Sequence, residues 1–157
     1  MTLYGALSQL TIPRTAVDAF RLTATTTAAG QTLALGRVNC ATGTTVTVAW
    51  GDGNSNTYSP GTGARTHVYA ASGTYTVSMF PKANITELNL SDTKLSGTID
   101  GSNPLPASLT YLSLYDLAGL TYNVSNNPLP ASLTYLTLGS LGGLTYNVNN
   151  NPLPASL

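Results

Sequence analysis

Few residues in this chain are suited to nucleophilic catalysis or metal binding. The sequence contains one cysteine, Cys40, and one histidine, His67, which together have the chemistry of a nucleophile and its base. A zinc site usually needs three or four ligands, so one cysteine and one histidine predict no metal site. Residue types alone leave a Cys–His nucleophilic pair open.

Paired carboxylates would suit glycoside hydrolysis. The acidic residues are Asp18, Asp52, Glu87, Asp92, Asp100 and Asp116. Asp52 lies between two glycines in an expected tight turn, and the last three aspartates fall at expected turns, where aspartate caps backbone amides. The sequence lacks the D-x-D-x-D pattern of a calcium loop, although an isolated calcium ion near Asp52 stays open. We therefore predict that the chain is not an enzyme and holds no cofactor.

Tyrosines at repeating positions are the best candidates for binding. Tyr111 and Tyr135 occupy the same place in consecutive repeats, and Tyr122 and Tyr146 do so on a second expected strand. Outward tyrosine rows offer rigid amphipathic contact area and can stack on sugar rings. A stacked aromatic row can equally serve only to stabilise neighbouring strands, and both interpretations stay open. The predicted binding residues are Tyr111, Tyr135, Tyr122, Tyr146, Ser113 and Thr137.

These tyrosines belong to an internal repeat of 24 residues. Residues 103–126 and 127–150 agree at 19 of 24 positions, a third copy begins at Asn151, and residues 84–99 are a divergent copy. One coil cannot bury its own leucines, but stacked coils join them into a continuous core. We expect Leu112, Leu114, Leu136 and Leu138 to be buried, with Tyr111 and Tyr135 exposed.

The L-x-x-L-x-L spacing in these copies resembles the leucine-rich repeat. The LSGTI ending of the first copy resembles the L-x-G-x-I subtype, and LPASLTYLTLG resembles the FNIP variety. The resemblance implies a short leucine-rich-repeat β-solenoid over residues 83–157. The asparagine expected after L-x-L is missing, because Thr93 and Leu117 stand near that site.

The segment before the repeats has alternating strand patterns at residues 20–27, 31–38, 44–50, 67–69 and 73–77. Its WGDG, H-x-Y and GTYTV sequences, in that order, resemble the PKD (polycystic kidney disease) domain, an immunoglobulin-like β-sandwich. The resemblance implies a sandwich over residues 20–82. It also implies structural roles for Trp50, Gly51, Asp52, Gly53, His67, Tyr69, Gly73 and Tyr75. With His67 in the H-x-Y position, we expect no catalysis by Cys40 and His67.

The composition supports an all-β fold and excludes several classes of protein. Threonine, serine and asparagine occur 25, 14 and 13 times, whereas only 8% of residues are charged and the net charge is zero. A nucleic-acid binder needs a basic stripe, and a polybasic membrane anchor needs a cluster of cations. No apolar run approaches the ~20 residues of a membrane span. We therefore predict no nucleic-acid partner and no membrane association.

A PKD domain followed by leucine-rich repeats resembles BspA-type bacterial surface proteins and related phage and prophage structural proteins. The resemblance implies a non-enzymatic virion-surface protein, such as a phage decoration protein or tail fibre, that presents its repeats to a host glycan or receptor. The alternatives are a secreted bacterial cell-surface adhesin and a carbohydrate-binding or other binding module appended to a secreted hydrolase.

The two ends of the chain carry further predictions. The first residues lack a signal-peptide pattern, and a virion-surface or extracellular location is expected. Residues 1–19 are expected to form an arm that docks on other virion or surface proteins. The repeats stop at Leu157 without a polar cap, and an uncapped array invites association, so we expect a homo-oligomer.

Overall fold

The fold is all-β, as the composition predicted. The computed structural model describes residues 18–145 and 151–157, so the predicted arm lies almost entirely outside the described residues. Within them the helical segments are two 3-10 turns, η2 (Lys82–Asn84) and η3 (Val124–Asn126). No helix in this part of the chain has the length and apolar character needed to span a membrane.

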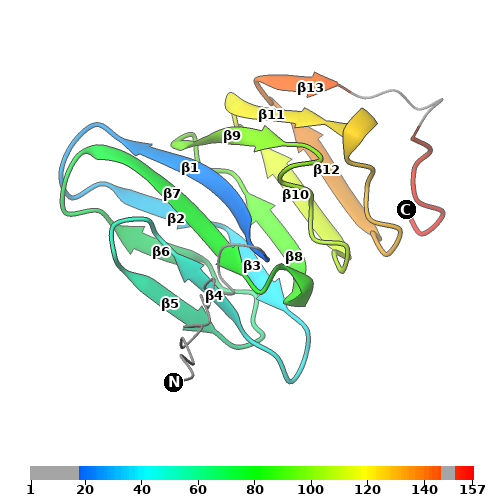
Figure 1. The fold of residues 1–157 in the computed structure, drawn as a ribbon, viewed down its shortest axis with the longest axis horizontal. Helices are drawn as coiled ribbons and strands as arrows, with labels where there is room; N and C mark the ends of the chain where they lie inside the picture. The colour runs from blue at the N-terminus through cyan, green and yellow to red at the C-terminus, as the bar shows by residue number, and fades with distance from the viewer. Residues whose placement is uncertain (1–17, 146–150) are drawn as a thin grey trace, which may run out of the picture.

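The strands form two large sheets and one small one (Figure 1). Their bounds are β1 (Phe20–Thr26), β2 (Thr32–Leu35), β3 (Arg37–Cys40), β4 (Val46–Ala49), β5 (Ser55–Tyr58), β6 (Arg65–Val68), β7 (Gly73–Phe80), β8 (Ile85–Leu90), β9 (Leu95–Ile99), β10 (Tyr111–Tyr115), β11 (Gly119–Asn123), β12 (Tyr135–Gly139) and β13 (Gly143–Thr145).

The first half of the chain is an antiparallel β-sandwich. One layer contains β1, β7, β4 and β5, and the other contains β3 and β8 together with the β2–β6 pair. Alternation along β1 places Phe20, Leu22 and Ala24 in the core, because successive side chains of a strand point to opposite faces. This arrangement is consistent with the immunoglobulin-like sandwich that the sequence predicted.

The second half stacks the repeats in parallel. Strands β8, β10 and β12 pair in parallel with a step of 24 residues, so that Glu87 lies opposite Tyr111 and Tyr111 opposite Tyr135. Strands β9, β11 and β13 form a second parallel ladder. The repeat period therefore becomes a spatial step from one coil to the next.

Both ladders continue sheets of the sandwich. Strand β8 pairs antiparallel with β3, and β9 pairs antiparallel with β1. The result is a sheet of seven strands, in the order β13-β11-β9-β1-β7-β4-β5, and a sheet of four, β12-β10-β8-β3 (Figure 1). One core cluster extends through both halves. The boundary predicted between residues 82 and 83 thus lies within a continuous hydrogen-bonded framework.

Side-chain hydroxyls join each coil to the one before it. Oγ of Ser108 donates to the Ile85 carbonyl at 2.7 Å, and Oγ of Ser132 donates to the Leu109 carbonyl at 2.7 Å. Oγ of Ser156 repeats the contact at 2.5 Å from the Leu133 carbonyl. Part of the hydroxyl-rich composition is therefore structural.

The strand predicted over residues 31–38 is two strands. The chain bends at Gly36, where an added Cβ would lie 3.1 Å from the side chain of Asn89. Before the bend β2 pairs with β6, and after it β3 pairs with β8. Sequence patterning also missed β5, because its residues are polar and largely exposed and show no alternation.

Candidate functional site

The predicted sandwich motif residues come together around Trp50. The indole ring is fully buried and stacks on His67, with ring centroids 5.0 Å apart and planes 8° apart. Trp50 donates from Nε1 to Oδ1 of Asn56 at 2.7 Å. His67 Nε2 lies 2.7 Å from Oδ2 of Asp52. Each polar atom near the indole is thus used in holding the sandwich.

Two tyrosines extend this cluster. Tyr69 meets His67 edge-on at 4.7 Å and stacks on Tyr75 at 4.2 Å. Its hydroxyl donates to the Trp50 carbonyl at 2.9 Å. Burial raises the pKa of Tyr69, so the hydroxyl keeps the proton that it donates.

Glycines shape the turn that carries Asp52. Gly51 has a φ of +88°, and a Cβ there would lie 2.7 Å from the backbone of Thr76. Gly53 also has a positive φ, of +93°, which glycine adopts at little cost. Burial acts to raise the pKa of Asp52, but hydrogen bonds from His67 and Asn54 outweigh it and lower the pKa below its usual value.

Comparison with known families agrees with this geometry. Residues 19–91 match the PKD domain family. The match contains β1 to β8, so it includes the first strand of the parallel ladder. The rest of the chain lies outside the match. No curated protein and no solved structure matches the chain.

The repeats carry a row of stacked groups on the outer face of the four-stranded sheet. The rings of Tyr111 and Tyr135 stack 4.3 Å apart and 1° from parallel. The guanidinium of Arg37 lies 5.0 Å from the centroid of Tyr111, and Arg37 Nη1 bonds Oε2 of Glu87 at 2.8 Å. We call Arg37, Glu87, Tyr111 and Tyr135 the tyrosine row.

Stacking determines which parts of the row can meet a ligand. Tyr111 has Arg37 over its ring and Tyr135 stacked against it, so its ring is engaged within the row. Burial, and then the neighbouring Tyr135, raise the pKa of Tyr111. Tyr135 is 47% exposed. The row therefore offers ring edges and hydroxyls more than ring faces.

A polar row lies beside the tyrosine row. The register places Ser113 opposite Asn89 on one side and Thr137 on the other. Oγ1 of Thr137 donates to the Tyr135 hydroxyl at 3.2 Å, which links the two rows, whereas Ser113 is buried, with 9% exposure. The predicted residues Tyr111, Tyr135, Ser113 and Thr137 thus lie on one face, but Ser113 offers little contact surface.

The expectation that Tyr122 faces outward is wrong. Tyr122 is fully buried, and its hydroxyl donates to the Asn127 carbonyl at 3.2 Å. The physical reason is the two-residue period of a strand, which places Tyr122 on the same face as the buried Leu120. Its repeat equivalent, Tyr146, lies outside the described residues.

The predicted leucine core is present in part. Leu112 and Leu114 are fully buried, whereas their equivalents Leu136 and Leu138 are half-buried and pack against the core. Strand β12 is the last of its ladder among the described strands, so these two leucines are covered from one side only.

The remaining candidates for chemistry have other partners. Cys40 is buried, with Sγ 3.5 Å from the Thr44 carbonyl, whereas His67 bonds Asp52. Asp92 pairs with Lys94, and Asp100 accepts hydrogen bonds from Ser102. In the described part of the chain, no three histidine, cysteine or acidic residues gather as a metal site would require.

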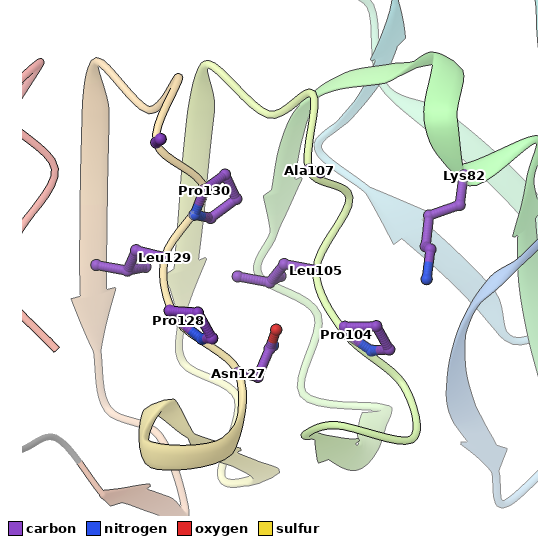
Figure 2. Close-up of a pocket in the computed structure, with 9 residues that line it drawn as sticks. Lys82, Pro104, Leu105, Ala107, Asn127, Pro128, Leu129 and Pro130 are labelled. Atoms are coloured by element: carbon purple, nitrogen blue, oxygen red, sulfur yellow. The ribbon is translucent and has the colours of Figure 1, made fainter. Parts of the chain in front are cut away.

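A shallow groove lies between two coils on their proline-containing loops. Figure 2 shows Leu105 and Leu129 from neighbouring loops, with Pro104, Pro128 and Pro130 around them. Among the described residues, Nδ2 of Asn127 has no hydrogen-bond partner and is buried. Since solvent does not reach this atom, a molecule lying in the groove would not contact it.

Sequence reasoning missed Arg37 and Glu87 as members of the tyrosine row. Glu87 stands 24 residues before Tyr111, so the repeat register carried a usable signal for it. No local signal identifies Arg37, because it reaches the row through the pairing of β3 with β8.

Proposed function

We propose that this chain is a non-enzymatic display module of an extracellular or virion-surface protein, in which the PKD sandwich holds leucine-rich repeats that bind a glycan or a receptor protein. The observation that carries the proposal is the tyrosine row, with the polar row beside it, on the outer face of the four-stranded sheet. These side chains are held on strands that continue a sheet of the sandwich, and rigid elements position a site better than loops do.

The parallel ladder supports the leucine-rich-repeat assignment. The leucines of β10 point into the core, while Tyr111 and Tyr135 lie on the opposite face. The step from β8 to β10 and from β10 to β12 is the sequence period itself. The ordering of a PKD region before such repeats supports a role on a virion or a bacterial surface.

The mode of binding follows from the use of the ring faces. Because Tyr111 and Tyr135 stack on each other, we expect recognition through their hydroxyls, through Thr137 and through the Arg37–Glu87 pair. Such groups can donate to and accept from the hydroxyls of a sugar. A receptor loop that is rich in polar side chains would meet the same donors and acceptors.

Replacing the hydroxyls tests this mode without removing the stack. We expect the wild-type chain to bind members of a glycan array, and the double variant Tyr111→Phe/Tyr135→Phe to bind them at least ~10-fold more weakly, a loss of about 1.4 kcal/mol. Tyr58→Phe is the matched control, because the guanidinium of Arg65 lies 4.3 Å from the Tyr58 ring in the sandwich. Equal binding by the double variant and the wild type would contradict the proposed site.

Location is tested separately. If the chain is displayed on a virion, it should copurify with intact virus particles. A bacterial adhesin would instead fractionate with the cell surface, and a module of a secreted hydrolase would be found in the medium with the enzyme.

A further inference from the structure

The last coil exposes the leucines that earlier coils bury. Leu109 and Leu133 are fully buried, whereas Leu157, the next equivalent, is 45% exposed. Leu120 is fully buried, but Leu144 is 44% exposed. The same residue type at the same repeat position therefore changes exposure only because no further coil lies against it within the described chain.

Leu153 follows the same pattern. It is 54% exposed, although its equivalents Leu105 and Leu129 are 5% and 9% exposed. We call the surface formed by β12, β13 and residues 151–157 the open end. Among the described strands, β12 and β13 each have a neighbour on one side only, so the open end combines apolar side chains with unpaired strand edges.

The open end has no charged group to keep another strand away. The last charged residue in the sequence is Asp116, and residues 117–157 contain no lysine, arginine, aspartate, glutamate or histidine. Natural sheet edges are commonly protected by charges, by proline or by a covering element. An apolar edge without such protection favours pairing with another neutral edge.

The surface that a second copy could bring here is limited by the fold. The opposite side of each parallel ladder is already paired with the sandwich, through β3 and β1. A second copy cannot stack its first coil on the open end without losing those pairs. The far edge of the seven-stranded sheet is β5, whose residues are polar and largely exposed, and it matches the exposed leucines poorly.

We propose that the open end docks against the open end of a second copy, giving a closed two-fold dimer. A two-fold axis perpendicular to the sheets would place β12 antiparallel to its counterpart, and β13 likewise. Such an interface uses one surface twice and leaves no free edge of the same kind, so association stops at two. It continues the packing that already joins each coil to the next, and it does not depend on the proposed binding function.

Sedimentation of the 157-residue chain at micromolar concentration tests the proposal. We expect a reversible dimer for the wild type, and at least a ~10-fold higher dissociation constant for Leu144→Lys/Leu153→Lys, because two desolvated charges would face two more across the axis. Val68→Lys is the matched control, since Val68 is 57% exposed in the sandwich, and it should dimerise as the wild type does.

A crosslinking experiment keeps the proposal testable if the charged variant does not fold. A cysteine in place of Thr137 lies on β12, and a bismaleimide should join it to its counterpart, whereas a cysteine in place of Thr57 on β5 should stay uncrosslinked. Native Cys40 is buried and should not react. A wild-type monomer at all concentrations, or open-ended polymers that Thr57→Lys abolishes, would overturn the proposal.

Discussion

The sandwich and the repeats are held together in different ways. In the sandwich, unlike side chains meet once each: the Trp50 indole, the His67 imidazole and the Asp52 carboxylate form a single cluster. In the repeats, a small set of contacts recurs at each step, such as the serine hydroxyls of Ser108 and Ser132 on the preceding coil. The two halves nevertheless share both sheets.

This difference determines how each half responds to substitution. A contact in the sandwich has no second copy, so its loss should affect the whole framework. A contact in the repeats has equivalents one step away, and its value depends on whether coils lie on both sides of it. Position along the array therefore matters as much as residue type.

The largest effect is expected from Trp50→Ala. Removing a fully buried tryptophan from the core should lower the free energy of unfolding by about 3–5 kcal/mol. Because both sheets pass from the sandwich into the repeats, the repeats should unfold with it in one transition. Chemical denaturation followed by tryptophan fluorescence is not available to this variant, so circular dichroism is the appropriate measurement.

The wild type provides the test of shared unfolding. Fluorescence of Trp50 reports on the sandwich, while hydrogen exchange of the β10 amides reports on the repeats. Coincident transitions are expected. Two separate transitions would show that the halves are independent in stability, despite their common sheets.

A pair of leucine variants compares the interior of the array with its end. Leu112→Ala should cost about 2–5 kcal/mol, as for other fully buried leucines. Leu136→Ala, the same change one coil later, should cost less, because Leu136 is half-buried and leaves a smaller cavity. Urea denaturation of both variants measures the difference. Equal losses would indicate that the end of the array is covered in solution.

Ser132→Ala should have a smaller effect. Its Oγ lies 2.7 Å from the Leu109 carbonyl and 3.2 Å from the Ala107 carbonyl, and the hydroxyl contributes about 0.5–1.5 kcal/mol if it behaves as a typical hydrogen bond. Ser55→Ala on the exposed β5 is the control and should change the free energy of unfolding little. A loss no larger than that of the control would mean that the hydroxyl contacts between coils do not stabilise the stack.

The smallest effect concerns pH. Hydrogen bonds from His67 and Asn54 lower the pKa of Asp52 in the folded chain, against the effect of burial. A lowered carboxyl pKa adds stability above the unfolded value and loses it as the pH falls through the folded value. Stability should therefore decline at pH values below about 4. Asp52→Asn should lose part of that pH dependence when both proteins are unfolded by urea across the acid range.

Much of the fold could be predicted from local patterns. The WGDG, H-x-Y and GTYTV sequences predicted the region that matches the PKD family, because their turns and buried aromatics depend on nearby residues. Alternation also predicted the burial of Leu112 and Leu114. The candidate site was less accessible to this reasoning, since Arg37 reaches Tyr111 only through the pairing of β3 with β8.

By itself, the sequence determined the all-β composition, the 24-residue step and the leucines that face inward, because these depend on residue type and on the two-residue period of a strand. The tertiary structure decided how the two halves join. Pairing of β8 with β3 and of β9 with β1 brings together residues about 50 to 70 positions apart, and no local pattern encodes such partners. The same long-range pairing placed Arg37 over Tyr111 and left the last leucines without a covering coil.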